Sequence, residues 1–213
     1  MSEYRLHCFA QSGNAYRAAL MLELTGQDWE PVFVDFFNGA SKTPEFLSLN
    51  EMGEVPVLEH GDLVLSQSGV IMDYLTGKTG KFGPNAETER LEILRWTLWD
   101  NHKLSSTIGT LRFLMNFLAP EKRNPDVIAF LGGRAKAAMT VLEHHLADRD
   151  WVATDQPTTA DFSCCSYLYF ADEFGADMNQ YPNTSRWLDG IAALPGWKHP
   201  YDLMPGHPLP GAK

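Results

Sequence analysis

The 213-residue chain has room for one large domain or two small ones, and 44% of its residues are hydrophobic, as in a folded protein. Its formal net charge is −10 and its acidic residues are spread along the chain, so the charge pattern argues against nucleic acid or an anionic membrane as a partner. No secretory signal and no bilayer-spanning apolar run is visible in the sequence. The three cysteines include no C-x-x-C pair, so we expect a cytoplasmic protein with neither a disulfide framework nor a metal site.

The first 77 residues alternate short strand-like and helix-like segments. Alternation of polar and apolar residues predicts strands, whereas helix formers between capping residues and glycine stops predict helices. The order of the elements is βαβαββα. The predicted segments are the strand Tyr4–Phe9, the helix Ala15–Thr25, the strand Pro31–Phe36, the helix Thr43–Leu49, the strands Val57–His60 and Leu63–Leu65, and the helix Ser66–Thr76.

The rest of the chain carries only helical patterns. Residues 78–85 are polar and rich in glycine and proline, which is typical of a linker. Apolar residues then recur at helical spacing, and the expected helices run from about Leu91 to Leu118, from Leu131 to Leu146, over Thr158–Asp172 and over Arg186–Leu194. The sequence therefore predicts an α/β domain over residues 1–77, a linker over 78–85 and an all-α domain over 86–213.

The segment Gln11–Arg17 directly follows the first strand and opens the first helix. A hydroxyl at this position lies at the positive end of the helix, beside free backbone N–H groups, which suits the binding of an anion such as a thiolate. Ser12 and Asn14 are the candidate side chains. On position alone, however, a plain N-cap role for either residue is the favoured reading.

Two further segments carry polar or unusual backbone groups. In Gly53–Leu58 a proline enters a strand, and a cis Val55–Pro56 bond would leave the backbone of Val55 free to pair with an extended, peptide-like ligand. Gln67 and Ser68 stand where a helix N-terminus can bind a carboxylate, although for this segment taken alone ordinary helix capping by Ser66 is the favoured explanation.

Five segments, taken together and in this order, resemble the cytosolic glutathione transferase superfamily. They are S-G-N-x-Y-R, T-P-E-F-L-x-L-N, G-E-V-P-V-L, L-S-Q-S-G-V-I-x-D-Y-L and T-T-A-D-F, and they cover nearly the whole chain. In the last of them, Thr158 and Asp161 have the spacing of a helix capping box, which we interpret as structural. The resemblance implies a thioredoxin-like N-terminal domain that binds glutathione, a helical C-terminal bundle that contributes the pocket for a hydrophobic electrophile, and a homodimer.

The resemblance also implies roles for single residues. Ser12 matches the serine that hydrogen-bonds the glutathione sulfur in serine-type enzymes, and Asn14 resembles an asparagine that assists in some bacterial classes. Free thiols of this kind have a pKa near ~8.5, and lowering it by about 2 units requires roughly 2.7 kcal/mol. One hydrogen bond from Ser12 to a charged sulfur supplies about 1.5–3 kcal/mol, and the helix N-terminus adds about 0.5–1 kcal/mol. These two contributions are sufficient without a partner histidine.

The remaining glutathione contacts follow from the same resemblance. Val55 would pair its backbone with the cysteinyl part of glutathione, with Pro56 in the cis form. Gln67 and Ser68 would bind the γ-glutamyl end, and Lys42 lies near the position that contacts the glycine carboxylate in some members.

The chain departs from the family pattern at several positions. Asn50-Glu51 replaces the usual Asn-Pro, Glu54 stands where a basic residue is common, and Cys8 lies inside a strand, which argues against cysteine-type chemistry. Three hypotheses therefore stand. The leading one is a transferase that detoxifies electrophiles. The second is a glutathione-dependent isomerase or a peroxide or disulfide reductase, and the third is a non-catalytic binding module.

Overall fold

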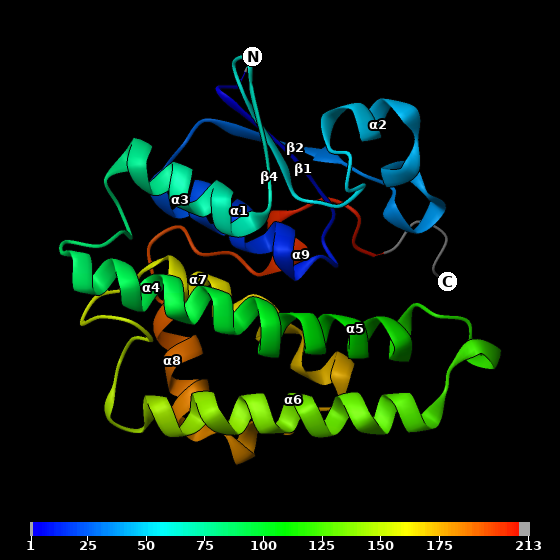
Figure 1. Ribbon diagram of the computed structural model, residues 1–213, viewed down its shortest axis with the longest axis vertical. Helices are drawn as coiled ribbons and strands as arrows, with labels where there is room; N and C mark the ends of the chain where they lie inside the picture. The colour runs from blue at the N-terminus through cyan, green and yellow to red at the C-terminus, as the bar shows by residue number, and fades with distance from the viewer. Residues whose placement is uncertain (1, 209–213) are drawn as a thin grey trace. The chain divides into compact units, whose positions relative to one another are not determined.

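The protein consists of two compact units, which we describe separately from a computed structural model covering residues 2–208 (Figure 1). Unit 1 contains residues 2–83 together with 194–208, and unit 2 contains residues 84–193. The chain thus leaves the first unit, forms the second and returns to the first. The predicted boundaries assign the whole C-terminal part to the helical domain, whereas its last described residues cluster with unit 1.

Unit 1 is built around a four-stranded mixed sheet in the order β2-β1-β3-β4. β1 pairs in parallel with β2 and antiparallel with β3, and β3 pairs antiparallel with β4. This is the α/β arrangement that the order of predicted elements indicates. The elements are β1 (Tyr4–Cys8), α1 (Gly13–Thr25), β2 (Trp29–Phe33), α2 (Pro44–Leu49), β3 (Val57–His60), β4 (Leu63–Ser66), α3 (Ser68–Thr79) and α9 (Pro200–Leu203).

Local sequence signals explain where the helices of unit 1 begin and end. α1 is capped by the Ser12 side chain and ends at Gly26, which has the left-handed conformation (φ 72°) that glycine adopts without steric cost. In α2 the Thr43 side chain accepts a hydrogen bond from the backbone N–H of Phe46, and proline occupies the first helical position. These predicted caps are confirmed.

β2 begins and ends earlier than the sequence pattern predicts. It covers Trp29–Phe33, with Pro31 paired to Leu6 of β1, whereas the prediction extended to Phe36. Proline is tolerated here because β2 is an edge strand. At the edge of a sheet, the missing N–H of a proline costs no hydrogen bond to a neighbouring strand. Phe36 instead opens a short 3₁₀ turn.

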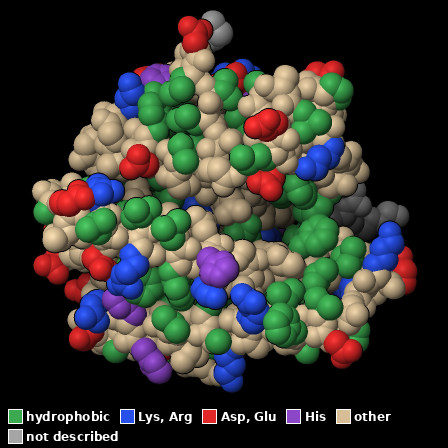
Figure 2. Space-filling model, viewed as in Figure 1, with side chains coloured by type: hydrophobic (Ala, Val, Ile, Leu, Met, Phe, Trp, Pro, Cys, Tyr) green, Lys and Arg blue, Asp and Glu red, His purple; other side chains and the backbone are tan. Residues whose placement is uncertain are grey.

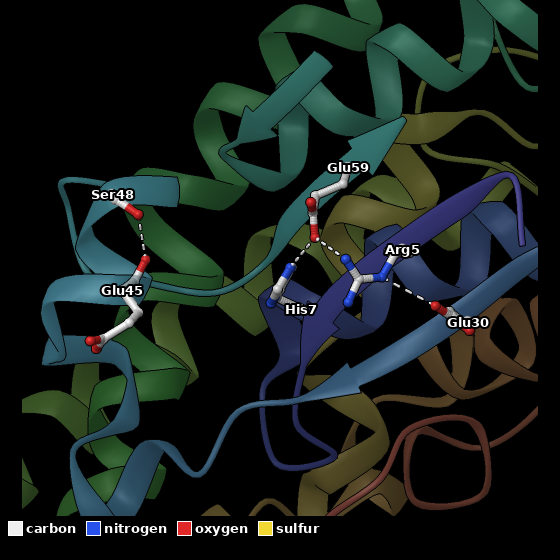
Figure 3. A network of polar contacts seen from close by, with 6 residues as sticks. All are labelled: Arg5, His7, Glu30, Glu45, Ser48 and Glu59. Carbon is white, nitrogen blue, oxygen red and sulfur yellow. Dashed lines mark hydrogen bonds and ion pairs between the residues drawn. The ribbon is translucent and has the colours of Figure 1, made fainter. Parts of the chain in front are cut away.

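One face of the sheet carries a network of charged side chains (Figure 3). The strand register places Arg5 of β1 opposite both Glu30 of β2 and Glu59 of β3, and its guanidinium contacts each carboxylate at 3.1 Å. Glu59 also contacts His7 Nε2 at 2.6 Å. Phe46 of α2 packs edge-on against the His7 ring, so α2 lies on this face. The alternate β1 residues are fully buried and form the core on the other face.

Unit 2 contains helices and no strand among its described residues. Its helices are α4 (Glu87–Trp99), α5 (Ser105–Asn116), α6 (Pro125–His145), α7 (Thr159–Cys165) and α8 (Pro182–Ala192). A π-helical turn, Asp100–Leu104, joins α4 to α5 without a break in the helical residues, so the predicted long helix contains one π-helical turn and ends at Asn116. No helix within residues 2–208 combines the length and the apolar character needed to cross a bilayer.

The predicted capping box at α7 is confirmed. The Thr158 side chain accepts a hydrogen bond from the backbone at Asp161, and the Asp161 side chain accepts one from the backbone N–H of Thr158. The fully buried Asp161 carboxylate also accepts hydrogen bonds from the backbone of Val152 and from the indole of Trp187, each within 2.9 Å. Burial raises the pKa of this carboxyl group, although the hydrogen bonds oppose that rise. Asp161 thus ties three segments of unit 2 together.

Candidate functional site

The strand register brings the predicted site segments of unit 1 to one edge of the sheet. His7, near the end of β1, lies opposite Val57 at the start of β3, and Val57 in turn lies opposite Ser66 at the end of β4. The loop after β1, the turn before β3 and the start of α3 therefore meet at this edge. Ser12, the Val55–Pro56 bond and the Gln67–Ser68 pair belong to these three segments.

Ser12 has the geometry of a helix N-cap with a hydroxyl hydrogen to spare. Its Oγ accepts a hydrogen bond from the backbone N–H of Ala15 at 3.1 Å, and its side chain is 7% exposed. A serine hydroxyl both accepts and donates, so this bond leaves the O–H free to donate to a ligand atom. Asn14 follows in the first turn of α1 and is half-buried. The capping role and a thiolate-binding role are thus compatible in the same side chain.

The Val55–Pro56 peptide bond is cis. Among the residues that the structure describes, neither backbone group of Val55 forms a hydrogen bond, while its side chain packs against the small core cluster around Val34 and Phe46. The side chain of Val55 is therefore anchored while its backbone N–H and C=O stay available. Such a pair of groups can extend a ladder to a peptide-like ligand.

Lys42 and Asn50 hold the turn that precedes Val55. The Lys42 ammonium donates to the carbonyls of Met52 and Gly53 at 3.3 and 3.0 Å, and the Asn50 amide donates to the Glu54 carbonyl at 2.8 Å. An ammonium group has three donors, so one of those on Lys42 remains. This structural role of Asn50 was not predicted from the sequence, where only the next residue, Glu51, stood out as a departure from the family pattern.

Gln67 and Ser68 form the start of α3. Gln67 has φ 67° and ψ 113°, a backbone conformation that side-chain-bearing residues seldom adopt, and its amide contacts the Met52 sulfur at 3.2 Å. No side chain caps α3, so its first backbone N–H groups are left for an anion, and Ser68 at the first helical position is buried. Two helix N-termini, those of α1 and α3, thus face the same edge of the sheet.

Two other potentially reactive side chains near this edge, those of Cys8 and Tyr16, are not available to a ligand. Burial raises the pKa of the Cys8 thiol to about 12, so this residue stays protonated at neutral pH. The Tyr16 hydroxyl donates to the Lys198 carbonyl at 2.9 Å and the side chain is fully buried. Within residues 2–208, no three His, Cys, Asp or Glu side chains lie together as a set of metal ligands. Of Cys8, Tyr16 and Ser12, Ser12 is the residue whose side-chain hydrogen remains available to a ligand.

Gln11 makes a contribution to the site that was not predicted from the sequence. Its side-chain amide donates to the Gly206 carbonyl at 2.7 Å, and the side chain is only 5% exposed. A polar residue directly before Ser12 was the only signal in the sequence, and its partner lies 195 residues away.

Comparison with known proteins agrees with this architecture. Residues 3–77 match the model of the glutathione S-transferase N-terminal domain, and residues 109–195 match that of the C-terminal domain. Glutathione S-transferase 1 from Dianthus caryophyllus is 47% identical over 183 residues, which cover 84% of this chain and 82% of the relative. The chain belongs to the glutathione S-transferase family.

Solved structures give the same result. A possible glutathione S-transferase from Rhodopseudomonas palustris superimposes with a TM-score of 0.89 at 32% sequence identity, covering 96% of this chain and 100% of that chain. A glutathione transferase from Burkholderia graminis, whose structure has two glutathione molecules bound per protein subunit, gives a TM-score of 0.81 at 28% identity and covers 92% of this chain and 85% of that chain.

Proposed function

We propose that this protein is a glutathione transferase that activates the thiol of glutathione for attack on a small hydrophobic electrophile. The observation that carries the proposal is Ser12, a buried hydroxyl at the N-terminus of α1 whose oxygen accepts the capping bond and whose O–H remains available. Family membership and the glutathione bound in the related Burkholderia graminis structure support glutathione as the ligand. Ser12 donates to the sulfur, the α1 N-terminus favours its negative charge, and Asn14 assists from the same turn.

The other predicted residues hold the rest of glutathione. The free backbone groups of Val55, next to the cis Pro56, pair with the cysteinyl residue. Gln67 and Ser68 bind the γ-glutamyl end at the uncapped start of α3. Lys42 uses its remaining donor for the glycine carboxylate. The exposed Glu54 lies in the same segment, and its charge opposes an anionic ligand, so we expect modest affinity.

The mechanism is a nucleophilic displacement. The thiol proton leaves to solvent, Ser12 stabilises the thiolate, and the sulfur forms a bond to the electrophilic carbon while the leaving group departs with its electron pair. The buried Asp161 and the histidines take no part in this scheme. Three free, buried cysteines suit a reducing cytoplasm, where we place the protein.

We further infer that the protein is a homodimer. The leucines of α4 at positions 91, 94 and 98 share one helical face, and their exposed fractions are 51%, 44% and 59%. Figure 2 shows hydrophobic side chains gathered over this helix. Monomeric proteins seldom leave such a stripe in water, so a second copy of the chain is its expected cover.

Calorimetric titration with glutathione, followed by assays of the products, tests the function. We expect binding in the micromolar to millimolar range and conjugation of an activated aryl halide. Exclusive turnover of a hydroperoxide, a model disulfide or a maleyl compound would instead establish the reductase or isomerase alternative. If millimolar glutathione produces no heat of binding, the protein is a binding module of another kind.

A further inference from the structure

Ser12 lies at the end of a tight turn whose two central residues are buried. The Ser12 N–H donates to the Phe9 carbonyl at 3.0 Å, which closes the turn around Ala10 and Gln11. Central residues of such turns usually face water, because a buried turn leaves backbone polar groups without partners. Here Ala10 is 0% and Gln11 5% exposed. Another part of the protein must therefore cover this turn.

The cover is the returning C-terminal segment, residues 197–208, which we call the C-terminal strap (Figure 1). The backbone N–H of Ala10 donates to the Pro205 carbonyl at 2.8 Å, and the Gln11 amide donates to the Gly206 carbonyl at 2.7 Å. Both central residues of the turn are thus bonded to consecutive carbonyls of the strap.

The strap is itself fixed to unit 1. The Lys198 carbonyl accepts from the Tyr16 hydroxyl at 2.9 Å, and the Lys198 ammonium contacts the Glu23 carboxylate at 2.6 Å, so α1 holds one end of the strap. At the other end Gly206 has φ 98°, and a Cβ there would lie 2.6 Å from the Phe33 ring. Only glycine fits this position without displacing Phe33 or straining the backbone.

We propose that the C-terminal strap positions Ser12, with Gln11 and Gly206 as the residues that couple the strap to the turn. This inference rests on the proposed function, because it assigns the strap a part in thiolate stabilisation. A charge-assisted hydrogen bond is short and directional, so a hydroxyl that moves with a loosened turn stabilises the sulfur less well. The strap is a positioning element and touches no reacting atom in this scheme.

Two shortened chains test the proposal. A chain ending at Met204 lacks both acceptor carbonyls, whereas a matched control ending at Pro208 keeps them. In the Met204 chain the glutathione thiol, followed by its ultraviolet thiolate band, should show a bound pKa higher by about 1 unit, which is about tenfold less thiolate below that pKa. The Kd of S-methylglutathione, which has no thiol to ionise, should change less than about threefold, or about 0.7 kcal/mol. The Pro208 chain should match the full chain in both measurements.

An unchanged thiol pKa in the Met204 chain would overturn the proposal. A similar, about tenfold, loss of S-methylglutathione binding would also overturn it, because that result means that the whole binding site is disrupted. If the Met204 chain does not fold, Gln11→Met in the full chain removes one of the two bonds, and it should raise the bound thiol pKa with the Kd of S-methylglutathione unchanged. No rise in that variant would also overturn the proposal.

A ligand-free measurement separates this proposal from the proposed function. Hydrogen exchange of the Ala10 and Ser12 amides should quicken by about tenfold or more in the Met204 chain and stay unchanged in the Pro208 chain. If the full chain does not bind glutathione, the proposed function is refuted. If hydrogen exchange of these two amides is unchanged in the Met204 chain, the proposed role of the C-terminal strap is refuted.

Discussion

Ser12, Tyr16 and Cys8 lie within a few residues of one another, and their environments give them different capacities. The thiol of Cys8 is buried in the sheet, which raises its pKa to about 12, and the phenol of Tyr16 is fully buried and bonded to the Lys198 carbonyl. Ser12 alone combines a position at a helix N-terminus with a hydroxyl hydrogen that its capping bond does not use. These differences in position and hydrogen bonding are the reason why we propose Ser12, rather than Tyr16 or Cys8, as the donor to the glutathione sulfur.

We predict that Gln67 lowers the free energy of unfolding and strengthens glutathione binding. Its positive φ of 67° costs a side-chain-bearing residue about 1 kcal/mol or more, and glycine avoids that cost. We expect Gln67→Gly to raise the free energy of unfolding by about 1 kcal/mol in urea titration while weakening glutathione binding about tenfold in calorimetry.

Gln67→Ala is the matched control for that prediction. Alanine keeps the steric cost of the positive φ and loses the same side-chain amide, so it should weaken glutathione binding as much as glycine does without stabilising the fold. Equal glutathione affinity in the wild type and both variants would show that the Gln67 side chain makes no contact with the ligand.

At the scale of elements, α8 depends on a carboxylate from another helix. No side chain from its own segment caps α8, and Glu143 of α6 accepts hydrogen bonds from the backbone N–H groups of Asn183 and Thr184 at 2.9 Å. Burial alone would raise the pKa of Glu143, but these hydrogen bonds outweigh burial and hold it below its usual value. The ionised carboxylate therefore stabilises unit 2.

Glu143→Gln should cost about 2 kcal/mol of unfolding free energy at pH 7. The native-state pKa is depressed, so the contribution of Glu143 is fully present above the unfolded-state pKa of about 4.3 and is lost as the pH falls through the lower native value. Urea unfolding at a series of pH values should thus show the difference between wild type and variant shrinking below about pH 4. A difference that stays constant to pH 2 would contradict the charge-based account.

Elements with local signals could be predicted from the sequence, and those set by distant partners could not. The caps at Ser12 and Thr43 and the capping box of Asp161 follow from residue types a few positions apart, and all three are confirmed. The bounds of β2 were wrong because pairing with β1, rather than its own alternation, sets where the strand ends. The π-helical turn at residues 100–104 left no mark in the apolar spacing.

The same distinction holds for the candidate site. Ser12, Val55 and Gln67 could be proposed from short motifs, and a free Val55 backbone was expected if the Val55–Pro56 bond is cis, as it is. The unusual φ of Gln67 appears only in the structure. The bond between Gln11 and Gly206 spans 195 residues, and no local pattern encodes such a pairing.

At the scale of the whole molecule, the stripe on α4 makes a prediction about assembly. Leu94→Glu places a charge in the middle of the stripe, and burying it against a second copy would be costly. We expect the wild type to sediment as a dimer and the variant to dissociate at least about 100-fold more readily. Phe130→Glu on α6, at a side chain that is 63% exposed, is the control and should leave the dimer intact. A monomeric wild type, or a dimeric Leu94→Glu variant, would refute this interface.

The role of Ser12 is best tested by the pKa of the glutathione thiol in the complex, read from its ultraviolet thiolate band across a pH series. For the wild type we predict a value about 2 units below the ~8.5 of a free thiol. Ser12→Ala should still bind glutathione but return the thiol pKa to within about half a unit of the free value. If the wild type binds glutathione and leaves its thiol pKa unchanged, or if Ser12→Ala keeps the full shift, the hydroxyl of Ser12 does not activate the thiol.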